Sequence, residues 1–392
     1  MTTAAAAKAS YAELARLFIR LSVTAFGGPP AHLAMAEDEI VRRRGWLTRQ
    51  QFLDLIAATN LIPGPNSTET MIHVGYTQRG VLGAVLAGAC FIVPAALISL
   101  ALAILYASTG MIPAVASLFW GLQPAIVAII AVAAWRLTPS ALKNRLLIVM
   151  FGAALLILAL DALPEAVVII GGGLLYALIM LRVASAAALL IPFVQIAVEL
   201  TERAAVSALD VFWYFLRIGS VLFGSGYVLF AYIQQDVVNT FGWLTQRQLL
   251  DAIAIGQFTP GPVLTTSTVV GYLAADLPGA LAATLGIFLP SFVLVLITAP
   301  YIPRMRQSRF LSAFLDGANA AVVAAIAATL LDLGRAALLP LPNAPDNLAG
   351  ISLLAIFLIG VSLVALARFR INATWVLIAC GAVGVVFGSL LG

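Results

Sequence analysis

Charged side chains are scarce in this chain of 392 residues, where they make up 10% of the sequence against 62% for hydrophobic ones. Soluble domains carry about 25% charged residues, and the mean hydropathy of this chain is +1.06. This composition argues against a water-soluble fold. The net charge of +4 is too small to indicate a nucleic-acid surface, so we expect no nucleic-acid partner.

Residues and motifs with redox, metal or nucleophilic chemistry are also few. The two cysteines, Cys90 and Cys380, lie inside apolar segments, which favours packed thiols over a disulfide or a metal pair. No Walker loop, H-E-x-x-H, C-x-x-C or G-x-S-x-G motif occurs in the sequence. We therefore expect no cofactor, no metal and no enzymatic activity.

Long apolar runs account for most of the chain. A helix needs about 20 apolar residues to cross the roughly 30 Å of hydrocarbon in a bilayer. Six runs qualify: 81–107, 112–134, 277–301, 310–331, 348–367 and 371–391. Two shorter runs lie at 146–160 and 166–181. This pattern predicts an all-α polytopic membrane protein, and we expect no cleaved signal peptide at the N-terminus.

The chain contains two related halves. Three turn motifs occur in both: Phe-Gly-Gly or Phe-Gly-Ser, then Gly-Trp-Leu-Thr, then Pro-Gly-Pro. Gly64 and Gly261 are 197 positions apart, and the later pair Gly75 and Gly271 are 196 apart. Related halves with Gly- and Pro-interrupted apolar segments are typical of secondary transporters, and the interruptions indicate the binding site.

Loop charges indicate that the two halves have opposite orientations. The first half has three arginines at 42–44, where the second half has the uncharged segment 239–241. Between the first two long spans the pattern reverses, because 108–110 is uncharged and Arg304, Arg306 and Arg309 lie in the second half. Cytoplasmic loops collect Lys and Arg. We therefore predict inverted-topology repeats with a periplasmic C-terminus.

We divide the chain into a first repeat (1–182), a linker (183–207) and a second repeat (208–392). Each repeat is expected to hold a Gly-broken helix, a Pro-Gly-Pro hairpin and about four to five spanning helices. Two crossing schemes fit an inverted topology. Either the Gly-broken helix spans and the linker lies in the interface, or that helix is re-entrant and 184–198 crosses. Basic residues near the N-terminus favour the second scheme.

The first Pro-Gly-Pro turn (63–65) lies between segments of about eleven and twelve residues. At 1.5 Å per residue each segment is about 17 Å long, or half a bilayer. This predicts a re-entrant hairpin with its tip near the midplane, and a kinked spanning helix is the alternative. Pro65 suits the start of a helix, whose free amides attract anions. Polar donors follow both turns: Asn66, Ser67 and Thr68 after the first, and Thr265 and Thr266 after the second (260–262).

Arg20 and Arg217 occupy the same repeat position. An arginine at membrane depth costs at least roughly 3 kcal/mol, so two equivalent arginines require an explanation. One hypothesis is that both face an anionic substrate. The alternative is that their long side chains extend to the membrane interface.

Glu69 and His73 are one helical turn apart and therefore share a helix face. An acid and an imidazole inside a membrane are candidates for proton coupling or gating, and a satisfied buried pair is the alternative. Gln123 and Asn319 are equivalent amides in the middle of long spans. They are candidates for gating, although helix–helix hydrogen bonding fits them equally well.

These motifs resemble those of the CHR chromate ion transporter family in its long, two-domain form. In the first half the resemblance rests on residues 26–30, 45–48, 63–69 and 72–76. In the second half it rests on 223–227 and 260–262, with Ser225 where a third glycine is more usual. The resemblance implies a multi-pass protein of the bacterial inner membrane that exports chromate and confers chromate resistance.

The predicted site combines the motif residues with the donors and charges described above, and places a tetrahedral oxyanion between the two Pro-Gly-Pro turns. The expected substrate-binding residues are Arg20, Arg217, Gly27, Gly28, Pro63, Gly64, Pro65, Asn66, Ser67, Thr68, Gly224, Ser225, Pro260, Gly261, Pro262, Thr265 and Thr266. The expected gating or coupling residues are Glu69, His73, Gln123 and Asn319.

Two alternative functions stay open. One is transport of sulfate or another oxyanion, because chromate and sulfate share shape and charge. The other is an anion channel or a channel-like membrane protein. The expected partners are a small oxyanion and the lipid bilayer, and the sequence leaves a homodimer open.

Overall fold

The structure is a computed structural model and describes residues 8–26, 28–109, 112–181, 206–223, 226–301, 308–339, 347–348 and 351–391. The predicted linker lies almost entirely outside these residues. So do Arg304 and Arg306, which contributed to the predicted orientation.

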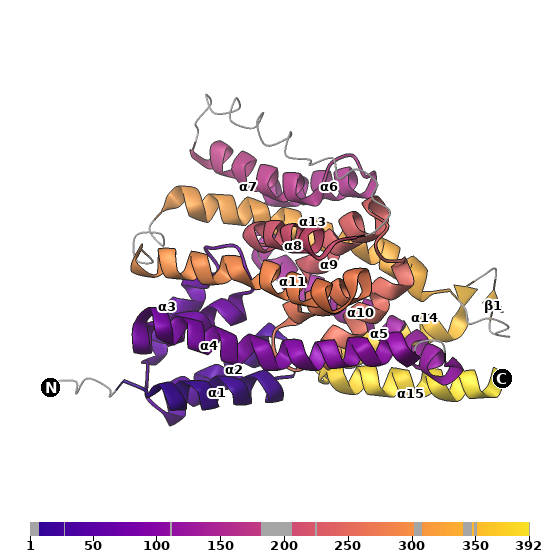
Figure 1. Cartoon of the computed structure of the whole chain (residues 1–392). Coiled ribbons are helices and arrows are strands. Elements are labelled where there is room, and N and C mark those ends of the chain that lie inside the picture. Colours follow the sequence, from indigo (N-terminus) through magenta and orange to yellow (C-terminus); the bar gives the residue numbers. More distant parts are fainter. Residues whose placement is uncertain are drawn as a thin grey trace.

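Helices form nearly all of the described chain (Figure 1). The first half contains α1 (Tyr11–Thr24), α2 (Pro29–Glu37), the π-helical segment η1 (Asp38–Arg43), α3 (Arg49–Thr59), α4 (Asn66–Thr109), α5 (Pro113–Ala141), α6 (Arg145–Ala159) and α7 (Glu165–Leu181). The second half contains α8 (Ala208–Val221), α9 (Val228–Tyr232), the π-helical η3 (Ile233–Thr240), α10 (Gln246–Phe258), the 3₁₀ turn η4 (Val263–Thr265), α11 (Thr266–Thr298), η5 (Ala299–Tyr301), α13 (Arg309–Ala337), α14 (Leu353–Ala367) and α15 (Ala373–Leu391). One short hairpin pairs β1 (Asn347–Leu348) with β2 (Ile351–Ser352).

Five helices are long and apolar enough to cross a membrane, which confirms the predicted all-α polytopic class. They are Asn66–Thr109, Ala114–Ala141, Val263–Tyr301, Arg309–Ala337 and Ala373–Leu390. Helices α6, α7 and α14 are apolar but shorter. In Figure 1 the long helices run side by side across the picture, with the N-terminal end of the chain at the left and the C-terminal end at the right.

The span predicted over 348–367 is wrong in its length. Residues at its start form the short hairpin, in which Leu348 pairs with Ile351. The helix then begins at Leu353, because the Ser352 side chain caps it by accepting a hydrogen bond from the Ala355 amide at 3.1 Å. The apolar run 348–367 therefore includes hairpin residues, and hydropathy alone does not distinguish them from the helix that follows.

Helix starts repeat between the two halves. Ser10 and Ser207 each begin a helix with a capping box, and Thr48 and Thr245 do the same. Each pair is 197 positions apart. A capping box satisfies two amide groups that a helix start would otherwise leave free. The same local chemistry therefore starts the same element twice.

Helices α4 and α11 each contain a sharp reversal. The backbone leaves the helical region at Arg79 and Gly80 in α4, and at Ala275 and Asp276 in α11. Across the first reversal, Gly75 packs directly against the Gly83 carbonyl. In a straight helix Gly75 and Gly83, eight residues apart, would be separated by about 12 Å and could not touch. The first part of α4 therefore folds back along the second part, and α11 repeats this arrangement.

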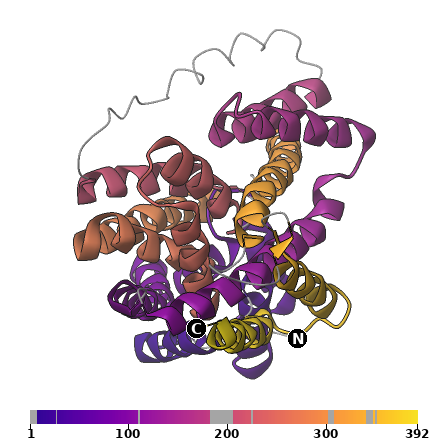
Figure 2. The same ribbon diagram turned by 90° about the vertical axis from the view of Figure 1, so that its right-hand side faces the viewer.

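The two halves interlock in their packing. Helix α4 packs against α11, with α1 beside α4 and α8 beside α11. In the rest of the molecule, α5 packs against α14 and α15, whereas α13 packs against α6 and α7. Each of these long helices thus packs against the last two helices of the opposite half. Figure 2 shows the same arrangement from the side, with α6 and α7 next to α13 and with α14 and α15 next to α5.

Candidate functional site

The two Pro-Gly-Pro turns contact opposite halves of the chain. The Gly64 amide donates a hydrogen bond to the Leu222 carbonyl at 2.7 Å, and the Gly261 amide donates to the Ala25 carbonyl at 3.1 Å. Leu222 and Ala25 are themselves equivalent, since each follows the first helix of its half. The two bonds are therefore related by the repeat, and they bring both turns to the interface between the halves.

Gly64 lies in a tight polar surrounding. Its φ angle is +136°, and a Cβ at this position would overlap the Glu69 carboxyl group and lie 2.8 Å from Ser291 Oγ. Only glycine fits such a position without displacing its neighbours. The Glu69 carboxylate therefore folds back over the turn that precedes its own helix.

Glu69 has no exposed surface. Ser291 of α11 faces its carboxylate, but neither Glu69 oxygen makes a well-formed hydrogen bond with a described residue. Thr68 Oγ1 and His73 Nε2 are likewise buried without a partner among the described residues. Buried polar groups are nearly always paired. A cluster of unpaired groups at one helix start therefore suggests a place for water, a proton or a ligand.

The second turn differs from the first. The hydroxyls of Thr265, Thr266 and Ser267 all donate to backbone carbonyls of the same turn, at 2.7 to 2.8 Å. All three side chains are buried. Their protons are used, so in this structure they offer no hydrogen to an anion. The predicted donors of the two turns are thus not equivalent.

His32 connects the two turns. Its Nε2 lies 3.2 Å from the Ala25 carbonyl, which also accepts the Gly261 amide, and its Nδ1 lies 3.3 Å from Ser67 Oγ. Contacts therefore run from the second turn through Ala25 and His32 to the start of α4.

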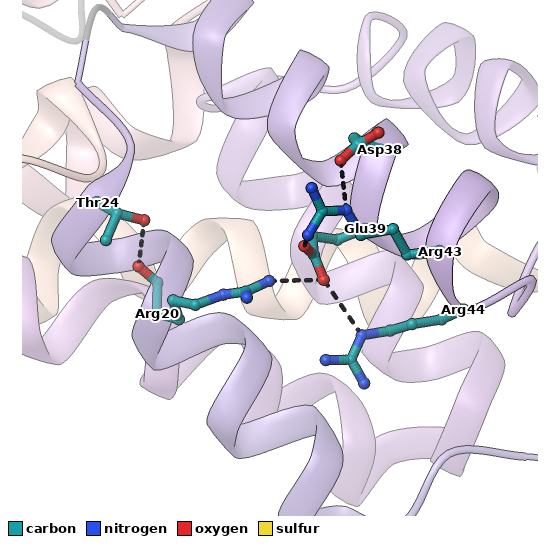
Figure 3. Close-up of polar contacts among 6 residues, drawn as sticks. All are labelled: Arg20, Thr24, Asp38, Glu39, Arg43 and Arg44. Atoms are coloured by element: carbon teal, nitrogen blue, oxygen red, sulfur yellow. Dashed lines mark hydrogen bonds and ion pairs between the residues drawn. The ribbon is translucent and has the colours of Figure 1, made fainter.

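Arg20 and Arg217 are paired with acids of their own halves. Arg20 contacts Glu39 at 2.6 Å, and Arg43 and Arg44 lie around the same carboxylate (Figure 3). Arg217 makes the matching contact with Asp236 at 2.8 Å. The two side chains remain 48% and 40% exposed. Glu39 and Asp236 are 197 positions apart, so alignment of the repeats alone would have indicated these partners.

Gln123 links helices rather than facing an open path. Its Nε2 donates to Asp251 Oδ1 at 3.2 Å, and the Tyr106 hydroxyl donates to the other oxygen of that carboxylate at 2.7 Å. The network joins α4 and α5 of the first half to α10 of the second. Asn319, at the equivalent position on α13, is only half buried. The helix–helix alternative for Gln123 is therefore favoured.

A cavity of about 860 Å³ adjoins the first turn. Its wall includes Phe26, Asn66, Arg136, Tyr227, Arg370 and Asn372. Asn66 is the first residue of α4, whereas Arg370 and Asn372 belong to the exposed connection between α14 and α15. The cavity thus joins the Pro-Gly-Pro region to the surface of the molecule.

The remaining predicted residues belong to the first turns of the two halves. Gly28 precedes α2, with a φ angle of +74°, and a Cβ there would lie 3.2 Å from the Tyr227 hydroxyl of the second half. Gly27, Gly224 and Ser225 lie outside the described residues.

Comparison with known proteins gives a consistent result. A family model described as chromate transporter matches residues 12–177 and 209–385. The chain is 32% identical to the chromate transport protein of Pseudomonas aeruginosa, over 96% of this chain and 92% of that protein. It is 30% identical to the chromate transport protein of Cupriavidus metallidurans, over 88% of each chain. A probable chromate transport protein of Synechococcus elongatus is 32% identical over 85% of this chain and 87% of its own length. No solved structure matches the chain significantly.

Proposed function

The chain belongs to the chromate transporter family, and we propose that it is a secondary transporter that exports chromate across the bacterial inner membrane. The observation that supports this proposal best is the pair of repeat-related hydrogen bonds, from Gly64 to Leu222 and from Gly261 to Ala25. They bring two interrupted helical segments to one interface between the halves. Transporters with repeated halves bind substrate at such an interface.

In this proposal the two halves are inverted repeats, with the N-terminus in the cytoplasm and the C-terminus in the periplasm. Arg136, Lys143 and Arg145 lie around the connection between α5 and α6. Asp161 and Glu165 lie around the connection between α6 and α7, at the other end of α6. Basic residues collect on the cytoplasmic side. The side of Figure 1 at which the N-terminal end lies is therefore assigned to the cytoplasm.

The ion pairs support a re-entrant first hairpin. Arg20 lies near the end of α1 and contacts Glu39 at the start of η1, so the chain reverses its direction between them. Arg217 and Asp236 support the same reversal in the second half. Of the two crossing schemes, these contacts favour the one in which the Gly-broken helix does not span.

Chromate is proposed to bind at the first Pro-Gly-Pro turn. The start of α4 presents the backbone amides of a helix N-terminus together with the side chains of Asn66, Ser67 and Thr68, which suits a tetrahedral anion. Arg20 and Arg217 then hold the hairpins together, because each is already paired with a carboxylate of its own half. Glu69 lies over the turn as the gating group.

The membrane potential is sufficient to drive export. An inside-negative potential drives a dianion outward, and this movement releases about 4.6 kcal/mol per 100 mV, twice the value for one charge. This corresponds to an accumulation ratio on the order of a thousandfold. A proton gradient is therefore not required, and Glu69 and His73 need not carry a coupled proton.

Flux into everted membrane vesicles tests the proposal. With an interior-positive potential and no pH gradient, vesicles holding the wild-type protein are expected to accumulate chromate. An excess of sulfate added to the same assay tests selectivity between the two oxyanions. If sulfate inhibits chromate uptake as strongly as unlabelled chromate does, the site accepts sulfate as well. Uptake that requires a pH gradient would instead indicate obligatory proton antiport. No saturable chromate uptake under either gradient would overturn the proposal.

Gly64→Ala is the matching variant. The added methyl group meets Glu69 and Ser291, so the initial rate is expected to fall at least about tenfold, equivalent to about 1.4 kcal/mol. Gly152→Ala is the control, because nothing lies within 4 Å of a Cβ at that glycine. Its rate should stay within about twofold of wild type at equal expression. Equal rates in both variants would remove the first turn from the transport site.

A further inference from the structure

The wall of the 860 Å³ cavity carries two arginines that the sequence did not indicate as site residues. Arg136 lies near the end of α5, and Arg370 lies between α14 and α15. Both are exposed. None of the described residues that line the cavity is acidic. An aqueous cavity whose wall carries positive charges and no negative ones concentrates anions.

Neither arginine has a carboxylate partner of the kind that Arg20 and Arg217 have. Among the described residues no carboxylate forms an ion pair with Arg136 or Arg370, whereas Arg20 and Arg217 each have one. The Arg136 guanidinium donates one hydrogen bond, to the Leu366 carbonyl at 3.0 Å. That bond fixes the position of the group and leaves its charge uncompensated. An unpaired, positioned guanidinium is well suited to a dianionic oxyanion.

The backbone at Arg370 is unusual. Its φ angle is +55°, in the left-handed region that residues other than glycine rarely adopt. Such conformations persist where the surrounding structure holds them, often at functional positions. The short connection between α14 and α15 therefore presents this side chain to the cavity in a defined orientation.

The cavity also leads to the proposed substrate position. Asn66, the first residue of α4, lines it, together with Tyr227 of the second half. Arg368 lies on the same connection as Arg370 and adds to the basic character of this face, whereas Lys143, on the connection between α5 and α6, is paired with Asp316 at 2.6 Å. By the same loop charges that orient the repeats, the cavity opens toward the cytoplasm.

We propose that this cavity is the cytoplasmic entrance of the transporter, where Arg136 and Arg370 capture a tetrahedral dianion before it moves to the first Pro-Gly-Pro turn. The inference rests on the proposed function. It assigns the charge that attracts the substrate to a pair of residues different from Arg20 and Arg217, and it makes the structure an inward-open conformation.

Concentration dependence in everted vesicles tests this inference, because their cytoplasmic face is outward. Arg136→Gln and Arg370→Asn are each expected to raise the KM for chromate about three- to tenfold, with the maximal rate within about twofold. Asparagine is chosen at 370 because it tolerates a positive φ. Arg136→Lys and Arg370→Lys keep the charge, so their KM values should stay close to wild type.

Arg145→Gln is the matched control. It removes the same charge from an exposed site at the start of α6, outside the cavity wall. Its KM should be unchanged. Raising the salt concentration should also reduce the KM difference between wild type and the two cavity variants, because screening weakens capture by charge. A fold defect would not produce that salt dependence.

The outcomes separate this inference from the proposed function. Wild-type vesicles that fail to accumulate chromate overturn the proposed function and the inference together. Active wild type with unchanged KM in both cavity variants overturns the entrance alone. The entrance is also overturned if Arg145→Gln raises the KM as much as the two cavity variants do, because the KM would then depend on general surface charge.

Discussion

The charge of Glu69 is expected to affect anion binding more than that of any other residue at the first Pro-Gly-Pro turn. It is fully buried at a helix start, it folds over Gly64, and its oxygens lack a well-formed hydrogen bond within the described chain. An ionised carboxylate there would occupy the position that attracts an anion, because the helix start favours negative charge. Glu69 and a bound dianion would therefore compete.

This competition leads to a prediction for Glu69→Gln, which keeps the shape of the side chain and removes its ability to ionise. In the wild-type protein the KM for chromate should increase as pH rises through the ionisation of Glu69, since the new charge repels the dianion. In the variant that part of the pH dependence should disappear. Initial rates across a pH series in everted vesicles measure both proteins.

Chromate itself takes up a proton in mildly acidic solution, so the informative quantity is the ratio of the two KM values in each buffer. A ratio that stays constant over the whole series would exclude Glu69 as a competing charge. His73 lies one turn further along the same helix and is unchanged in the variant.

At this scale the sequence predicted residue types better than their partners. The duplicated turns identified Gly64 and Gly261 from the sequence, because few residues other than proline and glycine build such turns. Their hydrogen-bond acceptors, Leu222 and Ala25, are backbone carbonyls. A carbonyl contact has no side-chain signature, so it could not be predicted. Ser291 was missed because a single serine in an apolar helix is not distinctive.

At the scale of the element, the first hairpin of each half is held by an ion pair between its two arms. Arg217 on α8 reaches Asp236 on η3 at 2.8 Å, with 40% of the arginine side chain and 15% of the aspartate side chain exposed. Solvent screens such a pair, so we expect it to contribute no more than about 1 kcal/mol. Its main effect is to fix the angle between the arms.

A double-mutant cycle on this pair tests its role. Arg217→Ala and Asp236→Ala should each lower the Tm in detergent by a few degrees, and the double variant should lose less than the sum. The exchanged pair, Arg217→Asp with Asp236→Arg, should recover part of both stability and transport. If the exchanged pair is stable but inactive, Arg217 is needed for transport itself and belongs to the substrate site.

The elements themselves were largely predictable from local signals. The Thr48 and Thr245 capping boxes follow the Gly-Trp-Leu motif in both halves, and the reversal at Arg79 lies where the twelve-residue segment after Pro65 was expected to end. The π-helical turns η1 and η3 were not foreseen, because no sequence periodicity marks them. The start of α14 was missed because the apolar run already begins at Leu348, within the preceding hairpin.

At the scale of the whole molecule, the halves are related in sequence but are not separate packing units. Helix α5 packs against α14 and α15, and α13 packs against α6 and α7. Hydropathy predicts which segments enter the membrane and not which of them touch. The interlocked arrangement could therefore not be derived from the sequence, although the repeat and its inverted charges were visible.

Interlocking leads to a prediction about divided chains. A cut within 183–207 yields two fragments, each of which ends in a helical hairpin whose packing partner lies in the other fragment. Either fragment expressed alone is expected to be degraded or aggregated, because the faces of α5 and α13 that bind those hairpins are left without their partners. Both fragments expressed together should assemble, with chromate transport restored to a measurable fraction of wild type.

Protease resistance and co-purification of a tag on one fragment with the other measure the assembly. The intact chain with a protease site inserted in the same segment is the control, because cleavage after folding should leave transport unchanged. A single fragment that unfolds cooperatively at the Tm of the intact protein would show that each half forms its own core. The contacts of α5 with α15 and of α13 with α7 argue against that result.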